Sequence, residues 1–197
     1  MKLFFTKVSP YGRKVRAVAI EKGLLEKIEH IEVDLKNKSQ ELLDANPLGA
    51  VPTLITDDGE ALYDSPVICE YLDRLVATPK LFPGGKRRFT ALRIAALADA
   101  VAECAVAIVL ESRRLPEQQS VQTIEKNKQA LELSLRVLEN DVKKLKSLSI
   151  APIAVASALG YVSFRLIDYN WQEKNKKLAR WYNNFIQRPS MQKTAPQ

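Results

Sequence analysis

The order of predicted strands and helices is the feature that most constrains how this chain folds. Strand-like runs alternate with amphipathic helical stretches over residues 1–77, and no strand pattern follows them. A linker over residues 78–88, which contains Pro79, Pro83 and two adjacent glycines, separates the two regions. The sequence therefore predicts an α/β domain over residues 1–77 and an all-helical domain over residues 89–197.

The first domain combines a strand–helix–strand unit with a hairpin and a final helix. Lys2–Thr6 and Ile28–Val33 are predicted strands, and the helix between them starts at Ser9-Pro10, where serine caps a helix and proline suits its first turn. After a short second helix, the turn signal Asp57-Asp58-Gly59 separates two antiparallel strands. A last helix begins at Asp64-Ser65-Pro66, which gives the order βαβαββα around a mixed sheet.

The second domain contains only helical patterns. Residues 89–115 are rich in alanine, which allows close helix packing, and apolar residues between Ile124 and Leu145 mark one face of a long helix. The stretch from 151 to 164 is apolar on nearly every side, which predicts a buried core helix. A further helix is expected over residues 176–187.

Few residues are available for metal binding or nucleophilic catalysis. Cys69 and Cys104 are the only cysteines, and neither has the spacing of a redox pair or a zinc site. His30 is the only histidine, so a multi-histidine metal site is excluded. Because His30 lies in a strand-like stretch, we expect it to have a structural role, and we expect no bound metal.

Charge and hydropathy argue against two further classes of protein. The net charge is +7, but the basic residues are dispersed along predicted helices without a basic arm or an aromatic-basic motif, so we expect no nucleic-acid binding. The longest apolar stretch, residues 150–164, is shorter than the roughly 20 residues of a membrane helix, and residues 1–14 lack the apolar core of a signal peptide. We therefore expect a cytoplasmic protein without a membrane span.

Three motifs carry a resemblance to a known family. They are SPYGRKVR at residues 9–16, NPLGAVPTL at residues 46–54 and DSPVICEYL at residues 64–72. With these motifs the whole chain resembles the glutathione transferase superfamily, and in particular its serine-type bacterial members. The resemblance implies a thioredoxin-like first domain that binds glutathione as co-substrate, an all-α second domain and a homodimer.

The resemblance places the glutathione site in the first domain. The proline that matches Pro52 is cis in the family, and the residue that matches Val51 offers its backbone to the cysteinyl part of glutathione. Asp64 and Ser65 lie at a predicted helix start, where free N–H groups and the helix dipole attract a carboxylate. In the family, the matching acidic-serine pair holds the γ-glutamyl end of glutathione.

The glycine carboxylate of glutathione needs a cation or an amide donor. Lys36, Lys38 and Gln40 occupy the loop that usually supplies this group in the family, and we favour Lys38.

Ser9 is the predicted catalytic residue. A hydroxyl at the start of a helix can donate to a thiolate, and the helix dipole also favours the negative charge. The position matches the serine or cysteine that activates glutathione in several bacterial and related classes. Thr6 and Tyr11 are alternative hydroxyl donors, and Arg13 is a weaker candidate that adds positive charge.

The predicted reaction is conjugation of glutathione to a hydrophobic electrophile, with Tyr11, Cys104 and Tyr161 lining the acceptor pocket. Dehalogenation, isomerisation and peroxide reduction are alternatives within the fold. A non-catalytic adaptor, as in stringent starvation proteins, is an alternative of another class. Ser9, Val51 and the Asp64-Ser65 pair favour the enzyme over the adaptor.

One position departs from the family pattern. Ser149-Ile150-Ala151 begins a motif that normally continues with aspartate as a capping box, but this chain has Pro152 there. Proline fits the first turn of a helix but cannot complete the reciprocal hydrogen bonds of the box, so we expect weaker capping of the core helix.

The uneven charge predicts that salt weakens the dimer. Residues 1–78 carry 10 Lys+Arg and 13 Asp+Glu, a net −3, while residues 79–197 carry 20 and 10, a net +10. If the first domain of one protomer packs against the helical domain of its partner, these opposite potentials favour association. We expect the dimer dissociation constant to rise with ionic strength in sedimentation experiments. A monomer at low salt would rule this arrangement out.

Overall fold

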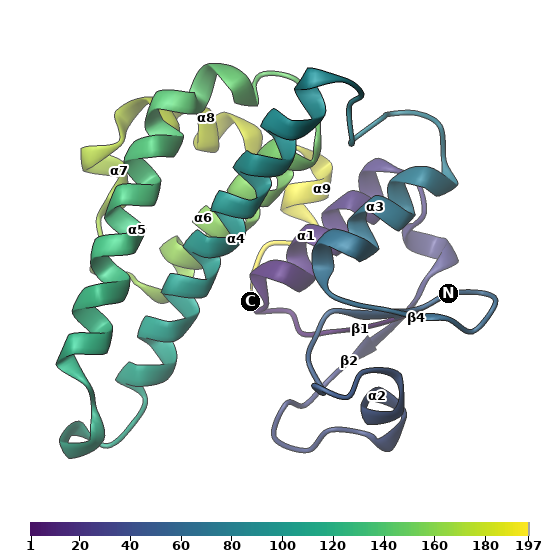
Figure 1. Cartoon of the computed structure of the whole chain (residues 1–197), viewed down its shortest axis with the longest axis horizontal. Coiled ribbons are helices and arrows are strands. Elements are labelled where there is room, and N and C mark those ends of the chain that lie inside the picture. The colour runs from purple at the N-terminus through teal and green to yellow at the C-terminus, as the bar shows by residue number, and fades with distance from the viewer. Residues whose placement is uncertain (197) are drawn as a thin grey trace. The chain divides into compact units, whose positions relative to one another are not determined.

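The computed structural model describes residues 1–196, which form two compact units (Figure 1). The first unit contains residues 1–82 together with residues 189–196, and the second contains residues 83–188. These units differ from the predicted domains chiefly at residues 189–196, which were expected in the helical domain and belong to the first unit.

The first unit is built on a four-stranded mixed sheet, as predicted. Its strands are β1 (Lys2–Phe5), β2 (Glu29–Glu32), β3 (Thr53–Ile55) and β4 (Ala61–Leu62), in the spatial order β2-β1-β3-β4. β1 pairs parallel to β2, whereas the β1–β3 and β3–β4 pairs are antiparallel. The predicted mixed sheet and the predicted antiparallel hairpin are therefore both confirmed.

Helices cover both faces of this sheet. α1 (Pro10–Glu21) and α3 (Ser65–Leu75) lie on one face and α2 (Gln40–Ala45) lies on the other (Figure 1). α1 and α3 pack side by side, and each presents apolar residues at helical spacing to the interior. The fully buried apolar side chains of this core come from strands and helices alike: Leu3, Phe4, Val15, Val18, Leu42, Leu54, Ile68 and Leu72.

A buried ion pair joins the C-terminal ends of α1 and α3. Lys22 Nζ donates to Asp73 Oδ1 at 2.8 Å and to the carbonyl oxygen of Pro79 at 2.6 Å. The carboxylate of Asp73 also accepts the N–H groups of Leu81, at 2.8 Å, and Phe82, at 3.1 Å. Because the pair connects the same ends of two adjacent helices, α1 and α3 run in the same direction and their N-termini lie at one end of the unit.

The C-terminal segment returns to the first unit and packs on α1. It includes the short helix α9 (Pro189–Gln192), and Met191 is buried. Arg13 Nη2 donates to the Met191 carbonyl oxygen at 3.1 Å, and Ser190 Oγ donates to Glu21 Oε1 at 2.5 Å. These contacts are the physical reason why the segment belongs with the first unit, although it follows the helical region in the sequence.

All the regular secondary structure of the second unit is helical. α4 (Lys86–Ser112) packs against both α5 (Val121–Asp141) and α6 (Ile150–Arg165). Every residue of α6 from Ile150 to Val162 is buried, which confirms the predicted core helix. The shorter elements of the described unit are the 3₁₀ turns Pro116–Gln118 and Val142–Leu145 and the helices α7 (Trp171–Lys174) and α8 (Lys176–Phe185).

The start of α6 agrees with the expected loss of a capping box. Ser149 occupies the position before the helix, and its side chain makes no capping hydrogen bond. Pro152 is the third residue of the helix, where it has no N–H to be satisfied and supplies no side-chain acceptor.

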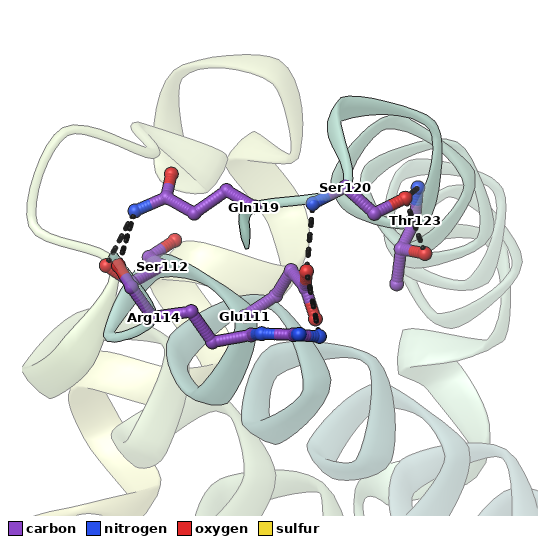
Figure 2. Close-up of polar contacts among 6 residues, drawn as sticks. All are labelled: Glu111, Ser112, Arg114, Gln119, Ser120 and Thr123. Atoms are coloured by element: carbon purple, nitrogen blue, oxygen red, sulfur yellow. Dashed lines mark hydrogen bonds and ion pairs between the residues drawn. The ribbon is translucent and has the colours of Figure 1, made fainter. Parts of the chain in front are cut away.

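The turn between α4 and α5 satisfies its polar groups with side chains (Figure 2). Gln119 Nε2 donates to the carbonyl oxygen of Ser112, the last residue of α4, at 3.2 Å, and to that of Arg114, just after the helix, at 2.9 Å. Glu111 accepts the Ser120 N–H at 2.7 Å, and Ser120 Oγ accepts the Thr123 N–H at 3.1 Å as the N-cap of α5. The helix ends are therefore capped where the chain reverses direction.

The residues considered for metal or redox chemistry are a histidine in β2 and two cysteines, one on α3 and one on α4. His30 Nε2 contacts the Leu25 carbonyl oxygen at 3.2 Å, and its ring meets Phe5 edge-on, which agrees with a structural role. Cys69 is buried, Cys104 is half-buried, and neither forms a disulfide. Within residues 1–196 no group of three or more potential ligands is placed to hold a metal ion, and no helix has the length and apolar character to cross a membrane.

The buried ion pair predicts a large loss of stability on removal of its acid. In Asp73→Ala the buried Lys22 ammonium keeps only the Pro79 carbonyl oxygen as a hydrogen-bond acceptor. The substitution also removes the acceptor for the N–H groups of Leu81 and Phe82. We expect the free energy of unfolding to fall by about 3 to 5 kcal/mol, measured by denaturant titration. Arg74→Ala is the control, since it breaks an exposed pair with Glu70 on the same helix and should cost under about 1 kcal/mol. Equal losses in the two variants would contradict the prediction.

Candidate functional site

Strand register brings three polar segments to one end of the sheet in the first unit. Phe4 lies opposite Thr53, and Leu54 lies opposite Leu62. The chain after β1, the chain before β3 and the chain after β4 therefore leave the sheet at the same end, because the β1–β3 and β3–β4 pairs are antiparallel. These segments contain Ser9, the Val51-Pro52 pair and the Asp64-Ser65 pair, respectively.

Ser9 is the N-cap of α1. Its Oγ accepts the Gly12 N–H at 3.1 Å, and its side chain is half-buried. A hydroxyl has two acceptor lone pairs and one proton, so this capping bond leaves the O–H of Ser9 able to donate to an anion. Capping and thiolate stabilisation are therefore compatible at this position.

Asp64 and Ser65 lie at the N-terminus of α3, as predicted. Asp64 occupies the N-cap position and is exposed, and its side chain makes no capping hydrogen bond. Ser65 is the first residue of the helix and is 1% exposed. The first N–H groups of a helix have no intrahelical partners, and the dipole adds positive potential there, so this end of α3 favours a carboxylate.

The peptide bond between Val51 and Pro52 is cis. Val51 is half-buried and precedes β3, so its main chain lies at the same end of the sheet as the starts of α1 and α3. Among residues 1–196, no group accepts a hydrogen bond from the Val51 N–H. This segment thus presents a backbone donor at the end of the sheet where α1 and α3 begin.

Lys38 is the member of the basic loop that reaches the segment before Val51. Gly49 has a φ of +54°, and a Cβ added to it would meet Lys38 Nζ and Cδ at 2.9 Å. By contrast, Gln40 Nε2 donates to Asp44 Oδ1 at 2.8 Å. Lys36 is exposed. The lysine favoured from the sequence is therefore the one whose ammonium lies against this segment.

Comparison with known proteins agrees with this geometry. A model of the glutathione S-transferase N-terminal domain matches residues 8–75, and a model of the C-terminal domain matches residues 97–189. The chain is 32% identical over its whole length to the uncharacterised GST-like protein YibF of Escherichia coli (strain K12), and the match covers 98% of that protein. This chain belongs to the glutathione S-transferase family.

A solved structure and a partial match extend the comparison of this family member. A glutathione transferase family member from Pseudomonas fluorescens Pf-5, solved with bound glutathione, is 37% identical; the alignment covers 100% of this chain and 98% of that one, with a TM-score of 0.96. The chain is also 40% identical over 99 residues to a stringent starvation protein A homolog of Histophilus somni, which is 48% of this chain and 45% of that protein.

Arg13 and Tyr11 lie at the start of α1. Arg13 is 6% exposed and donates to the Met191 carbonyl, so the structure gives it a contact with the C-terminal segment that the sequence did not indicate. Tyr11 is half-buried in the first turn of the helix.

Cys104 and Tyr161 lie in the second unit, on the packed helices α4 and α6. Burial raises the pKa of the Cys104 thiol, and the charge of Glu103 raises it further. Burial also raises the pKa of Tyr161, although Arg165 and Arg113 act in the opposite direction. Both groups therefore stay protonated at neutral pH, which suits the walls of an apolar pocket better than nucleophiles.

Sequence reasoning missed two buried polar residues near the site. Asn46 and Thr53 are 1% and 0% exposed and hydrogen-bond to each other at 2.9 Å. The available signal was the Asn-Pro pair directly after α2, because asparagine commonly shapes the turns that end a helix. It identifies a turn, but it does not reveal that the side chain is buried.

Proposed function

We propose that this protein is a glutathione transferase that binds glutathione in its first unit and adds the thiolate to a hydrophobic electrophile. One observation carries the proposal: the N-terminus of α1 with Ser9, the Val51 main chain and the N-terminus of α3 with Ser65 lie at one end of one sheet. Each of these groups favours a different part of glutathione.

The tripeptide has two carboxylates and one ammonium to satisfy. The γ-glutamyl carboxylate binds the Ser65 hydroxyl and N–H at the start of α3, and exposed Asp64 binds the ammonium. The cysteinyl main chain pairs with the backbone of Val51. Lys38 takes the glycine carboxylate as a point charge beside Gly49. The family member from Pseudomonas fluorescens Pf-5, whose structure holds glutathione, supports this choice of ligand.

Ser9 stabilises the thiolate. Its free O–H donates to the sulfur, and the N-terminus of α1 adds the helix dipole. Serine at this position suits conjugation rather than thiol–disulfide exchange, since it has no sulfur that forms a mixed disulfide. Two protomers form a homodimer.

An adaptor without catalytic activity is the second candidate function. The partial match to a stringent starvation protein A homolog favours it. Retention on immobilised glutathione followed by turnover of a generic aryl halide separates the two functions. A transferase is retained and active, whereas a protein that is neither retained nor active would support the adaptor.

Ser65→Ala tests the binding role of α3. Loss of one charge-assisted hydrogen bond costs about 1.5 to 3 kcal/mol, or roughly 10- to 150-fold in affinity. We expect the KM for glutathione to rise by this factor in steady-state kinetics while kcat stays near the wild-type value, because Ser65 does not contact the sulfur. An unchanged KM would place the γ-glutamyl group elsewhere.

Ser9→Ala tests the catalytic role. The thiol of free glutathione has a pKa of about 8.5, and without the Ser9 hydroxyl the bound thiol should titrate closer to that value. We expect kcat/KM at neutral pH to fall roughly 10- to 150-fold, with the pH–rate profile displaced to higher pH and glutathione binding nearly intact.

Ser120→Ala is the matched control, because Ser120 also caps a helix through a 3.1 Å bond, but in the second unit. Loss of either cap costs about 1 kcal/mol of stability, so the two variants share that effect and only Ser9→Ala should alter the pH profile. A wild-type profile in Ser9→Ala would reduce Ser9 to a helix cap and point to Tyr11 or Thr6.

A further inference from the structure

The loop that joins α2 to β3 is organised by one buried asparagine. Asn46 Nδ2 donates to Thr53 Oγ1 at 2.9 Å and to the Ala50 carbonyl oxygen at 3.3 Å, while Oδ1 accepts the Leu48 N–H at 3.0 Å. The main-chain carbonyl oxygen of Asn46 accepts the Gly49 N–H at 2.8 Å. Both the Nδ2 and the Oδ1 atoms of the Asn46 side chain therefore have hydrogen-bond partners inside the loop.

Thr53 closes the same network from the first residue of β3. Its hydroxyl donates to the Ala50 carbonyl oxygen at 2.8 Å and accepts from Asn46. The Ala50 carbonyl thus receives two donors, and both donor side chains are almost completely buried. A buried network in which each polar group has a partner favours a single loop conformation.

The Ala50 carbonyl and the Val51 N–H belong to the same planar peptide unit. The peptide that joins Ala50 to Val51 is not among the cis bonds of the described chain, so its C=O and N–H point in opposite directions. Two donors hold the carbonyl toward the interior of the loop. The Val51 N–H, which has no acceptor among residues 1–196, is therefore directed away from that network.

We propose that Asn46 and Thr53 are positioning residues for glutathione, which fix the orientation of the Ala50–Val51 peptide so that its N–H meets the cysteinyl main chain. This inference rests on the proposed function. It adds two residues that do not touch the tripeptide but set the direction of the backbone group that binds it.

Thr53→Val provides the sharpest test, since valine nearly matches threonine in shape but lacks the hydroxyl. With the full chain, we expect calorimetric titration with glutathione to give a Kd about 3- to 10-fold higher than wild type, the effect of losing one hydrogen bond. The KM for glutathione should rise with it while kcat with an aryl halide is kept, and Thr53→Ser should restore binding. Asn46→Asp keeps the acceptor for Leu48 but no longer donates to Ala50, so it should also weaken binding.

Thr56→Val is the matched control, because it removes a buried threonine hydroxyl at the other end of β3. Thr56 Oγ1 contacts Asp58 and accepts the Glu60 N–H at 2.9 Å, remote from Val51 in the strand register. Its Kd for glutathione should stay at the wild-type value. Equal weakening by Thr53→Val and Thr56→Val would reflect general destabilisation and overturn the inference.

The outcomes also separate this inference from the proposed function. If the wild-type chain binds glutathione and folded Thr53→Val binds it equally well, the positioning role is wrong and the transferase proposal stands. If the wild-type chain fails to bind glutathione, both fall together.

Discussion

The ion pair between Lys22 and Asp73 is the interaction on which the geometry of the first unit most depends. An isolated charge in this interior would be costly, but each member here has further hydrogen-bond partners in the backbone that leads from Pro79 to Phe82. The pair fixes the C-terminal ends of α1 and α3 relative to each other. It thereby keeps their N-termini together at the opposite end, where Ser9 and Ser65 lie.

The candidate site uses main-chain groups and helix dipoles more than titratable side chains. Under the proposed function, these groups stabilise the thiolate and bind the carboxylates without the single histidine, whose ring contacts the Leu25 carbonyl oxygen. Because the candidate site relies on main-chain groups, residues that shape the backbone become as important for glutathione binding as the residues that would touch the ligand. Asn46 and Thr53 belong to the first group, and Ser9 and Ser65 to the second.

Much of the fold was predictable because its signals are local. The turn at Asp57–Gly59, the serine-proline helix starts and the all-apolar stretch over residues 151–164 each specify one element without long-range information. The partnership of Lys22 with Asp73 was not predictable, since it joins positions 51 residues apart and both residues look like ordinary surface charges in sequence. The packing of α9 on α1 was not predictable for the same reason, since it too joins distant positions in the sequence. In the site, motif residues were identifiable by type, whereas the buried network behind Val51 became apparent only with the loop geometry.

The return of residues 189–196 to the first unit gives that unit a discontinuous sequence. A ribosome makes α1 before residues 83–188, and it must complete all of these residues before Met191 can reach Arg13. The N-terminal sheet and helices can form during synthesis, but one side of α1 stays uncovered until translation has passed the helical unit. Contacts from residues 189–196 therefore complete a unit whose sheet and first helices precede residues 83–188 in synthesis.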